Sequence, residues 1–170
     1  MHKWSIERKN NNMKTAIFPG SFDPFTRGHA NIVEQALQLF DHVVIAIGDN
    51  VGKRSLLSLT NRLRLIRRLY ENNPKVSCVA YSTLTGELAE EMGAGAIIRG
   101  VRNSIDFEYE RTMAQTNKRL FPGITTVILL TPPELNDVSS STVRELLQFG
   151  RDVKEFMPEG IDISNYLEQK

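Results

Sequence analysis

The sequence predicts an α/β protein: a single doubly wound domain built around a five-stranded parallel sheet. Two observations support this prediction. Short β-branched runs alternate along the chain with longer segments in which apolar residues recur at helical spacing, which is typical of βαβ units. A length of 170 residues suits one compact domain with a full hydrophobic core, and no internal repeat or linker divides the chain.

Five segments have the composition of strands. The run at 41–48 is continuously apolar from Val43 to Ile47, as expected of a parallel strand covered on both faces. The other four are shorter runs rich in apolar or β-branched residues. Right-handed crossovers would place all five in one sheet. The expected strands are 14–18, 41–48, 75–81, 94–98 and 125–130.

Helices are expected between these strands and after the last one. In the second helix Thr60 is the expected N-cap, and an apolar stripe runs along one face with four arginines largely off it. The stripe consists of Leu63, Ile66, Leu69 and Tyr70, and the arginines are Arg62, Arg64, Arg67 and Arg68. The expected helices are 28–40, 60–71, 86–92, 105–120 and 139–149, with a short one after Pro158.

Composition and charge narrow the class of protein. A net charge of +1 gives no reason to expect a nucleic acid or a membrane as partner. No apolar run is long enough to span a bilayer, and residues 1–12 lack the apolar centre of a secretory signal. Cys78 is the only cysteine and lies in an apolar run, so we expect it to pack in the core. We expect a cytoplasmic protein with a disordered N-terminal extension at 1–12 and a folded domain at 13–170.

The strongest functional signal is the loop that joins the first strand to the first helix. Residues 18–29 read Phe-Pro-Gly-Ser-Phe-Asp-Pro-Phe-Thr-Arg-Gly-His. Gly20 and Gly28 permit close approach of the backbone, and the helix start offers free N–H groups to an anion. His29, in the first turn, can donate a hydrogen bond to that anion. The alternative is a connecting loop with a capping histidine, which the length of the pattern disfavours; neither a Walker loop nor a G-x-G-x-x-G motif is present.

Further cations follow the carboxyl ends of expected strands, where ligands bind in doubly wound sheets. Lys53 lies in a glycine-containing loop, which is a weak signal because most loop lysines are only solvated. Arg99 and Arg102 follow a buried run and have the planar donor groups that suit phosphate oxygens. Surface salt bridges with Asp106 or Glu108 are the alternative reading of these arginines.

Acids and hydroxyls occupy the starts of two later helices. The acids at 106–110 suit the positive end of a helix dipole, and one of them could contact a ribose or orient an arginine. Ser139, Ser140 and Ser141 offer N-caps and phosphate donors together, although capping needs only one of them. The sequence therefore favours a polyphosphate held between two helix N-termini.

These motifs also carry a family resemblance. Thr26-Arg27-Gly28-His29 resembles the [HT]-x-G-H signature of the nucleotidylyltransferase superfamily. Ile-Arg-Gly-Val-Arg at 98–102, Asp-Phe-Glu-Tyr-Glu at 106–110 and Val-Ser-Ser-Ser at 138–141 follow in order. Through these motifs and Lys53, the segment from residue 13 to about 160 resembles the phosphopantetheine adenylyltransferase family, whose fold is Rossmann-like. Residues 13–170 would then be the adenylyltransferase domain.

The resemblance implies that the adenylyl group of ATP is transferred to 4′-phosphopantetheine, giving dephospho-coenzyme A and pyrophosphate in coenzyme A biosynthesis. The acceptor phosphate would attack in line, and His29 would stabilise the transition state. The residues implied in ATP binding are Ser21, Phe22, His29, Gly100, Val101, Arg102, Glu110, Leu135, Asn136, Asp137, Val138, Ser139, Ser140 and Ser141. Those implied in binding phosphopantetheine are Ser21, Lys53, Thr85 and Arg99.

The resemblance also implies partners. Mg²⁺ would accompany ATP with no dedicated metal site in the chain, coenzyme A and dephospho-coenzyme A would bind as inhibitor and product, and six copies would form a homohexamer. Two departures from the family pattern stand out. Ser21 replaces the threonine of many members but keeps the hydroxyl, and residues 135–137 replace an aromatic-containing stretch, so adenine contacts there would be mostly to backbone.

Two other functions fit some of these features. One is a nucleotidylyltransferase of the same fold that acts on nicotinamide mononucleotide or a phospho-alcohol. The other is a sensor or scaffold that binds ATP without turnover, although such a protein would have little need for His29, Lys53, Arg99 and Arg102 together. Release of pyrophosphate with different acceptors distinguishes all three.

Overall fold

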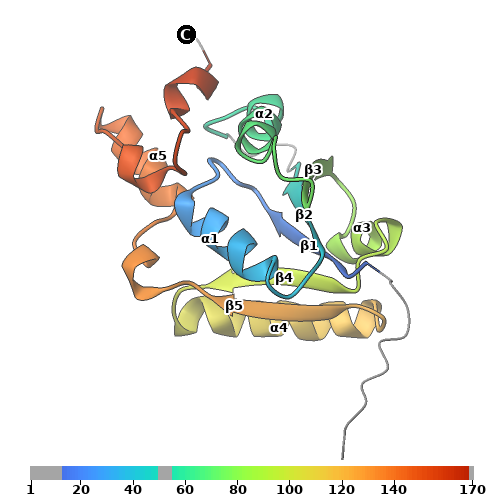
Figure 1. Ribbon diagram of the computed structural model, residues 1–170. Coiled ribbons are helices and arrows are strands. Elements are labelled where there is room, and N and C mark those ends of the chain that lie inside the picture. The colour runs from blue at the N-terminus through green and yellow to red at the C-terminus, as the bar shows by residue number, and fades with distance from the viewer. Residues whose placement is uncertain (1–12, 50–54, 169–170) are drawn as a thin grey trace, which may run out of the picture.

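The fold is organised by one parallel sheet whose strand order is β3-β2-β1-β4-β5 (Figure 1). The computed structural model describes residues 13–49 and 55–168. All four neighbouring strand pairs are parallel, which confirms the predicted five-stranded α/β sheet. The strands are β1 (Thr15–Gly20), β2 (His42–Gly48), β3 (Val76–Tyr81), β4 (Ala96–Val101) and β5 (Thr125–Leu130).

Helices cover both faces of this sheet. In Figure 1, α1, α2 and α5 lie on one face, and α3 and α4 lie on the other. Successive residues of β1 serve the two layers in turn: Ala16 and Phe18 pack in the larger core cluster, and Ile17 packs in the smaller one. The helices are α1 (Arg27–Ala36), α2 (Leu59–Leu69), α3 (Thr85–Glu91), α4 (Ser104–Leu120) and α5 (Ser140–Gln148), with 3-10 turns η1 (Pro133–Leu135), η2 (Lys154–Phe156) and η3 (Ile163–Tyr166).

The strand order creates a switch point beside β1. From β1 the chain builds β2 and β3 on one side, then crosses to β4 and β5 on the other. Ligands bind in such sheets beyond the carboxyl ends of the strands at this reversal. The loops after β1 and β4 therefore meet at the place where a ligand is expected.

Several predicted boundaries were wrong. β4 continues past Ile98 to Val101 because each of its last residues pairs with β5, and Gly100 lets the strand pass closely beside Ile32 of α1. α1 ends at Ala36, after which the N–H groups of Gln38 and Leu39 bond to carbonyls three residues back in place of the helical four. Within the described residues, the 3-10 turn η3 follows Pro158 in place of the predicted helix.

The face and the cap assigned to α2 also need correction. Ser58, not Thr60, caps the helix, accepting a hydrogen bond from the Asn61 N–H at 3.3 Å. Leu65 is fully buried and lies at the centre of the apolar face. Arg62 was expected to lie off that face, but it is 5% exposed because its side chain reaches inward beneath the loop that follows β1.

Among the residues that the structure describes, no helix has the length and apolarity needed to cross a membrane.

Packing of α3 depends on the absence of a side chain at Gly86. A Cβ there would lie 2.0 Å from a ring carbon of Phe121. We predict that Gly86→Ala lowers the free energy of unfolding by about 1–3 kcal/mol, the usual cost of overpacking. Urea denaturation measures the change. Gly95→Ala is the matched control, because a Cβ at Gly95 has no atom within 4 Å; equal loss of stability in both variants would contradict the packing argument.

Candidate active site

The loop between β1 and α1 is hydrogen-bonded to α2 and to the segment that leads into it. Arg62 donates from Nη1 to the carbonyl oxygen of Ser21 at 2.8 Å. The carboxylate of Asp23, 7% exposed, accepts hydrogen bonds from the backbone N–H groups of Leu56 and Leu57, each at 2.8 Å. A buried carboxylate with two amide donors is well compensated, so this contact fixes the loop to residues more than thirty positions away.

The start of α5 fastens the same loop from the other side. Ser140 donates its hydroxyl to the carbonyl oxygen of Pro24 at 2.8 Å. Arg144 donates to the carbonyl oxygen of Asp23 at 2.7 Å and to the hydroxyl of Ser141 at 3.0 Å. A serine has a single O–H, so the proton of Ser140 is committed to this contact. The starts of α1 and α5 are thereby held next to each other.

His29 lies in the first turn of α1 with its ring orientation determined by Thr26. The backbone N–H of Thr26 donates to Nδ1 of His29 at 3.0 Å. Because Nδ1 accepts this hydrogen bond, a neutral imidazole must carry its proton on Nε2. Three phenylalanine rings surround the imidazole, with centroids 5.1–6.3 Å away: Phe18, Phe22 and Phe25.

The electrostatic environment keeps this imidazole neutral. Burial is the main cause, and the positive charge of Arg102 adds to it; together they lower the pKa of His29 from 6.5 to about 4. At neutral pH the ring is therefore uncharged and presents Nε2–H as a hydrogen-bond donor. A neutral donor at a helix N-terminus suits a group that accumulates negative charge.

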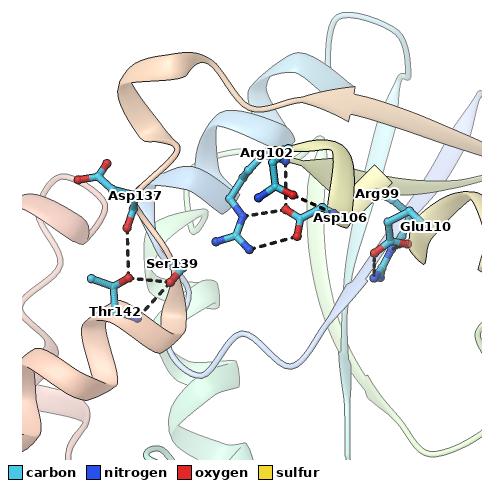
Figure 2. Close-up of polar contacts among 8 residues, drawn as sticks. Arg99, Arg102, Asp106, Glu110, Asp137, Ser139 and Thr142 are labelled. Carbon is cyan, nitrogen blue, oxygen red and sulfur yellow. Dashed lines mark hydrogen bonds and ion pairs between the residues drawn. The ribbon is translucent and has the colours of Figure 1, made fainter. Parts of the chain in front are cut away.

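Arg99, at the carboxyl end of β4, is held in one orientation by a carboxylate of α4. Its Nε donates to Glu110 at 2.6 Å, its Nη2 contacts the second Glu110 oxygen, and its Nη1 donates to the Pro19 carbonyl at 3.0 Å. Glu110 is buried, which makes this bidentate pair rigid (Figure 2). One acid of the 106–110 cluster thus orients an arginine, as one reading of the sequence expected.

Arg102 forms the second cation of the site and pairs with Asp106. Its Nε donates to the Asp106 carboxylate at 2.9 Å, and its backbone N–H donates to the same oxygen at 3.2 Å (Figure 2). Partial burial acts in the opposite direction, but the hydrogen bonds and charge of Arg102 hold the pKa of Asp106 below its usual value. The salt-bridge reading of the sequence was therefore right about this pair, and Arg102 nevertheless lines the cavity.

The hydroxyls at the start of α5 divide their roles. Ser139 is the N-cap, accepting from the Thr142 N–H at 3.0 Å, and its hydroxyl also bonds to that of Thr142 at 2.9 Å. The Thr142 hydroxyl donates to the carbonyl of Asp137 at 3.2 Å, which closes the turn (Figure 2). Ser141 accepts from Arg144, so its own O–H remains available as a donor.

These residues meet in a cleft of 640 Å³ at the switch point. The cleft is lined by the loop after β1, by the end of β4, and by the starts of α1, α4 and α5. Most of the residues predicted to bind the nucleotide face it. The predicted residues that line it are Ser21, Phe22, His29, Arg99, Gly100, Arg102, Glu110, Val138, Ser139, Ser140 and Ser141.

A second cavity of 490 Å³ adjoins the first. Ser21, Arg99 and Glu110 line both cavities, so Arg99 lies where they meet. Thr85 lines only the second cavity, where its hydroxyl is 2.9 Å from that of Tyr81. The apolar side chains of α4 that face this space give it a character different from that of the first cavity.

Other predicted residues lie elsewhere. Val101 is 2% exposed and faces the interior, because alternate residues of a strand point to opposite sides. Leu135, Asn136 and Asp137 belong to η1 and the turn after it, and they do not line the first cavity. Lys53 lies outside the described residues.

Arg144 and Tyr109 line the first cavity and were missed by the sequence analysis. For Arg144 the available signal was a basic residue one turn after the serine cluster.

Over the ranges 13–49 and 55–168, no group of three or more His, Cys, Asp or Glu side chains could hold a metal ion.

Comparison with known proteins agrees with this geometry. A family model described as cytidylyltransferase-like matches residues 17–146. The phosphopantetheine adenylyltransferase of Porphyromonas gingivalis is 53% identical over 145 residues, covering 85% of this chain and 94% of that protein. The proteins of the same name from Bacteroides thetaiotaomicron and Lactobacillus johnsonii are each 46% identical, over 89% and 88% of this chain and 100% and 90% of their own lengths.

The chain belongs to the phosphopantetheine adenylyltransferase family. Membership confirms the resemblance seen in the motifs and the Rossmann-like α/β fold. It also identifies the chain as an enzyme of the nucleotidyltransferase class. Within this family the cleft at the switch point is the candidate active site, because it contains the motif residues of α1, β4 and α5 together.

The protonation of His29 can be measured by NMR. We predict that its imidazole titrates with a midpoint of about 4 and is protonated only on Nε2 at pH 7. Because the unfolded chain binds this proton near pH 6.5, the folded state should lose stability as pH falls from 6.5 to 4, by up to about 1.4 kcal/mol per pH unit.

His29→Asn assigns the resonance and should flatten the stability profile over that range. His42→Asn is the control, since His42 lies at the start of β2 and contacts Ser77 at 2.9 Å. A midpoint for His29 near 6.5 would contradict the lowered pKa.

Proposed function

We propose that this chain transfers the adenylyl group of ATP to 4′-phosphopantetheine, producing dephospho-coenzyme A and pyrophosphate for coenzyme A biosynthesis. The observation that carries the proposal is the pair of adjoining cavities that meet at Arg99. The first cavity has the helix N-termini and cations that suit a nucleotide triphosphate. The second has the mixed polar and apolar lining that suits a phosphorylated arm of moderate length. The names of the relatives agree with this pair of substrates.

In the proposed complex the acceptor phosphate binds at Arg99 and the ATP phosphates lie near His29, Arg102 and the start of α5. The acceptor phosphate oxygen attacks the α-phosphorus in line, a new P–O bond forms, and the bond from that phosphorus to the pyrophosphate oxygen breaks. The substrate phosphate is already a nucleophile, so no protein group has to be covalently modified. Catalysis then consists of positioning and charge stabilisation.

We assign charge stabilisation at the reacting phosphate to His29. Its Nε2–H is a donor at neutral pH, and its pKa of about 4 makes it unsuited to hold a proton for release. Ser21, Phe22, Gly100, Ser139, Ser140 and Ser141 are proposed as further ATP contacts, together with Val101, Glu110, Val138 and residues 135–137. Lys53, Thr85 and Arg99, with Ser21, are proposed to bind phosphopantetheine.

The remaining partners follow from the family. Mg²⁺ is proposed to enter with ATP, bound by phosphate oxygens and water, as is usual for this ion. We further propose a homohexamer acting in the cytoplasm, with coenzyme A competing for the same cavities. Light scattering after size-exclusion chromatography measures the assembly, and calorimetry with coenzyme A measures the competition.

A pyrophosphate-release assay with several acceptors tests the function. Purified protein and Mg-ATP are combined with 4′-phosphopantetheine, nicotinamide mononucleotide or a simple phospho-alcohol. We expect release only with 4′-phosphopantetheine, and dephospho-coenzyme A as the product by mass spectrometry. Pyrophosphate release mainly with nicotinamide mononucleotide would show that the proposed acceptor is wrong. ATP binding without pyrophosphate release with any acceptor would favour a sensor.

Replacement of His29 tests its proposed role. Loss of one donor to a developing negative charge typically costs about 100- to 1,000-fold in turnover, so we predict a fall in kcat of that order for His29→Ala. Circular dichroism should show the variant folded. His42→Ala serves as the control and should retain turnover, since His42 does not line the cleft. Wild-type turnover in His29→Ala would exclude the role.

A further inference from the structure

Arg62 is a buried cation that the proposed chemistry leaves without a role. It lies on α2 and is 5% exposed. No Asp or Glu oxygen within the described ranges forms an ion pair with it, and its Nε has no hydrogen-bond partner there. A buried charge without a carboxylate is energetically costly, and an apolar residue would fill the space at lower cost. The position of the one hydrogen bond that its side chain makes within the described residues therefore matters.

That contact is the 2.8 Å hydrogen bond from Nη1 to the carbonyl oxygen of Ser21. The Ser21–Phe22 peptide is trans, so its N–H points opposite to its carbonyl. With the Ser21 oxygen turned toward Arg62, the N–H of Phe22 points away from Arg62. Ser21 and Phe22 both line the first cavity. Within the described part of the chain, no hydrogen bond uses the N–H of Phe22.

The local backbone needs such support. Phe22 has φ of 48°, in the left-handed region that a bulky side chain seldom adopts. Such a conformation persists only when its surroundings hold it in place. Packing of the Phe22 ring against Phe18 and Phe25 holds the side chain, but among the described residues only Arg62 hydrogen-bonds to the carbonyl that determines the plane of the preceding peptide.

We propose that Arg62 is a positioning residue for the Ser21–Phe22 peptide, holding the Ser21 carbonyl away from the cleft so that the Phe22 N–H can bind a substrate phosphate. Without this hydrogen bond the peptide can rotate and turn its carbonyl oxygen toward the cleft. A carbonyl oxygen there repels phosphate, whereas the N–H attracts it. The effect on turnover rests on the proposed adenylyl transfer; the effect on phosphate binding does not.

The chain offers a matched control on the same helix. Arg64 also donates to a backbone carbonyl, that of Asn165, but it is exposed and lines neither cavity, with its guanidinium over the Tyr166 ring. Arg62→Met and Arg64→Met therefore each remove one cation and one contact to a carbonyl from α2. Only the first removes a contact to the loop of the active site.

The first measurement is steady-state pyrophosphate release from Mg-ATP and 4′-phosphopantetheine. A displacement of about 1 Å in an active site can lower turnover about 100-fold, so we expect a fall of roughly 10- to 100-fold for Arg62→Met and little change for Arg64→Met. Arg62→Lys keeps the charge and should recover part of the loss. Arg62→Ala leaves space for a small cation, and millimolar methylguanidinium should raise its turnover but not that of His29→Ala.

The second measurement follows the backbone amide of Phe22 by NMR while Mg-ATP or inorganic pyrophosphate is added. We expect a large shift in the wild type and Arg64→Met, and a smaller one in Arg62→Lys and Arg62→Ala. If the wild type shifts but does not turn over, the proposed function fails and the positioning role stands. Wild-type amide shifts and turnover in the Arg62 variants would overturn the positioning role. A loss of turnover that parallels a fall in melting temperature and is not rescued by methylguanidinium would also overturn it.

Discussion

The hydrogen bonds that hold the loop between β1 and α1 in place are the constraint on which the candidate active site depends. The loop contributes few hydrogen bonds of its own to its shape. Its carbonyl oxygens at Ser21, Asp23 and Pro24 are held by side chains of α2 and α5, and the Asp23 carboxylate is held by the N–H groups of Leu56 and Leu57. A segment with a φ of 48° at Phe22 can be stable only with this external support.

This arrangement couples the helix that carries His29 to elements remote in sequence. Arg144 and Ser140 bring the N-terminus of α5 beside the N-terminus of α1, so that the starts of two helices border one cleft. Two positive helix ends facing the same space repel each other in the absence of an anion. A polyphosphate bound there would remove this repulsion, so the arrangement favours an anion at this position.

The cations of the cleft are oriented by the protein's own carboxylates and carbonyls. Arg99 is held by Glu110 and the Pro19 carbonyl, and Arg102 by Asp106. Preorganised donors lose little conformational freedom when a ligand binds and reorganise little during reaction. Neutral His29 follows the same principle. The Thr26 N–H holds Nδ1, so the proton of the neutral ring is on Nε2. The site is built from groups whose geometry other residues determine.

The sequence by itself determined the α/β class, the five strands and the motif residues of the cleft at the switch point, because strand and helix periodicity and helix-start chemistry are local properties. It could not determine boundaries such as the end of β4, which depends on pairing with β5. Nor could it show that Arg62 is buried or that Ser140 holds Pro24, since these contacts join residues 41 and 116 positions apart. Periodicity places a residue on a face of its own helix; only the tertiary structure decided which distant carbonyl that residue meets.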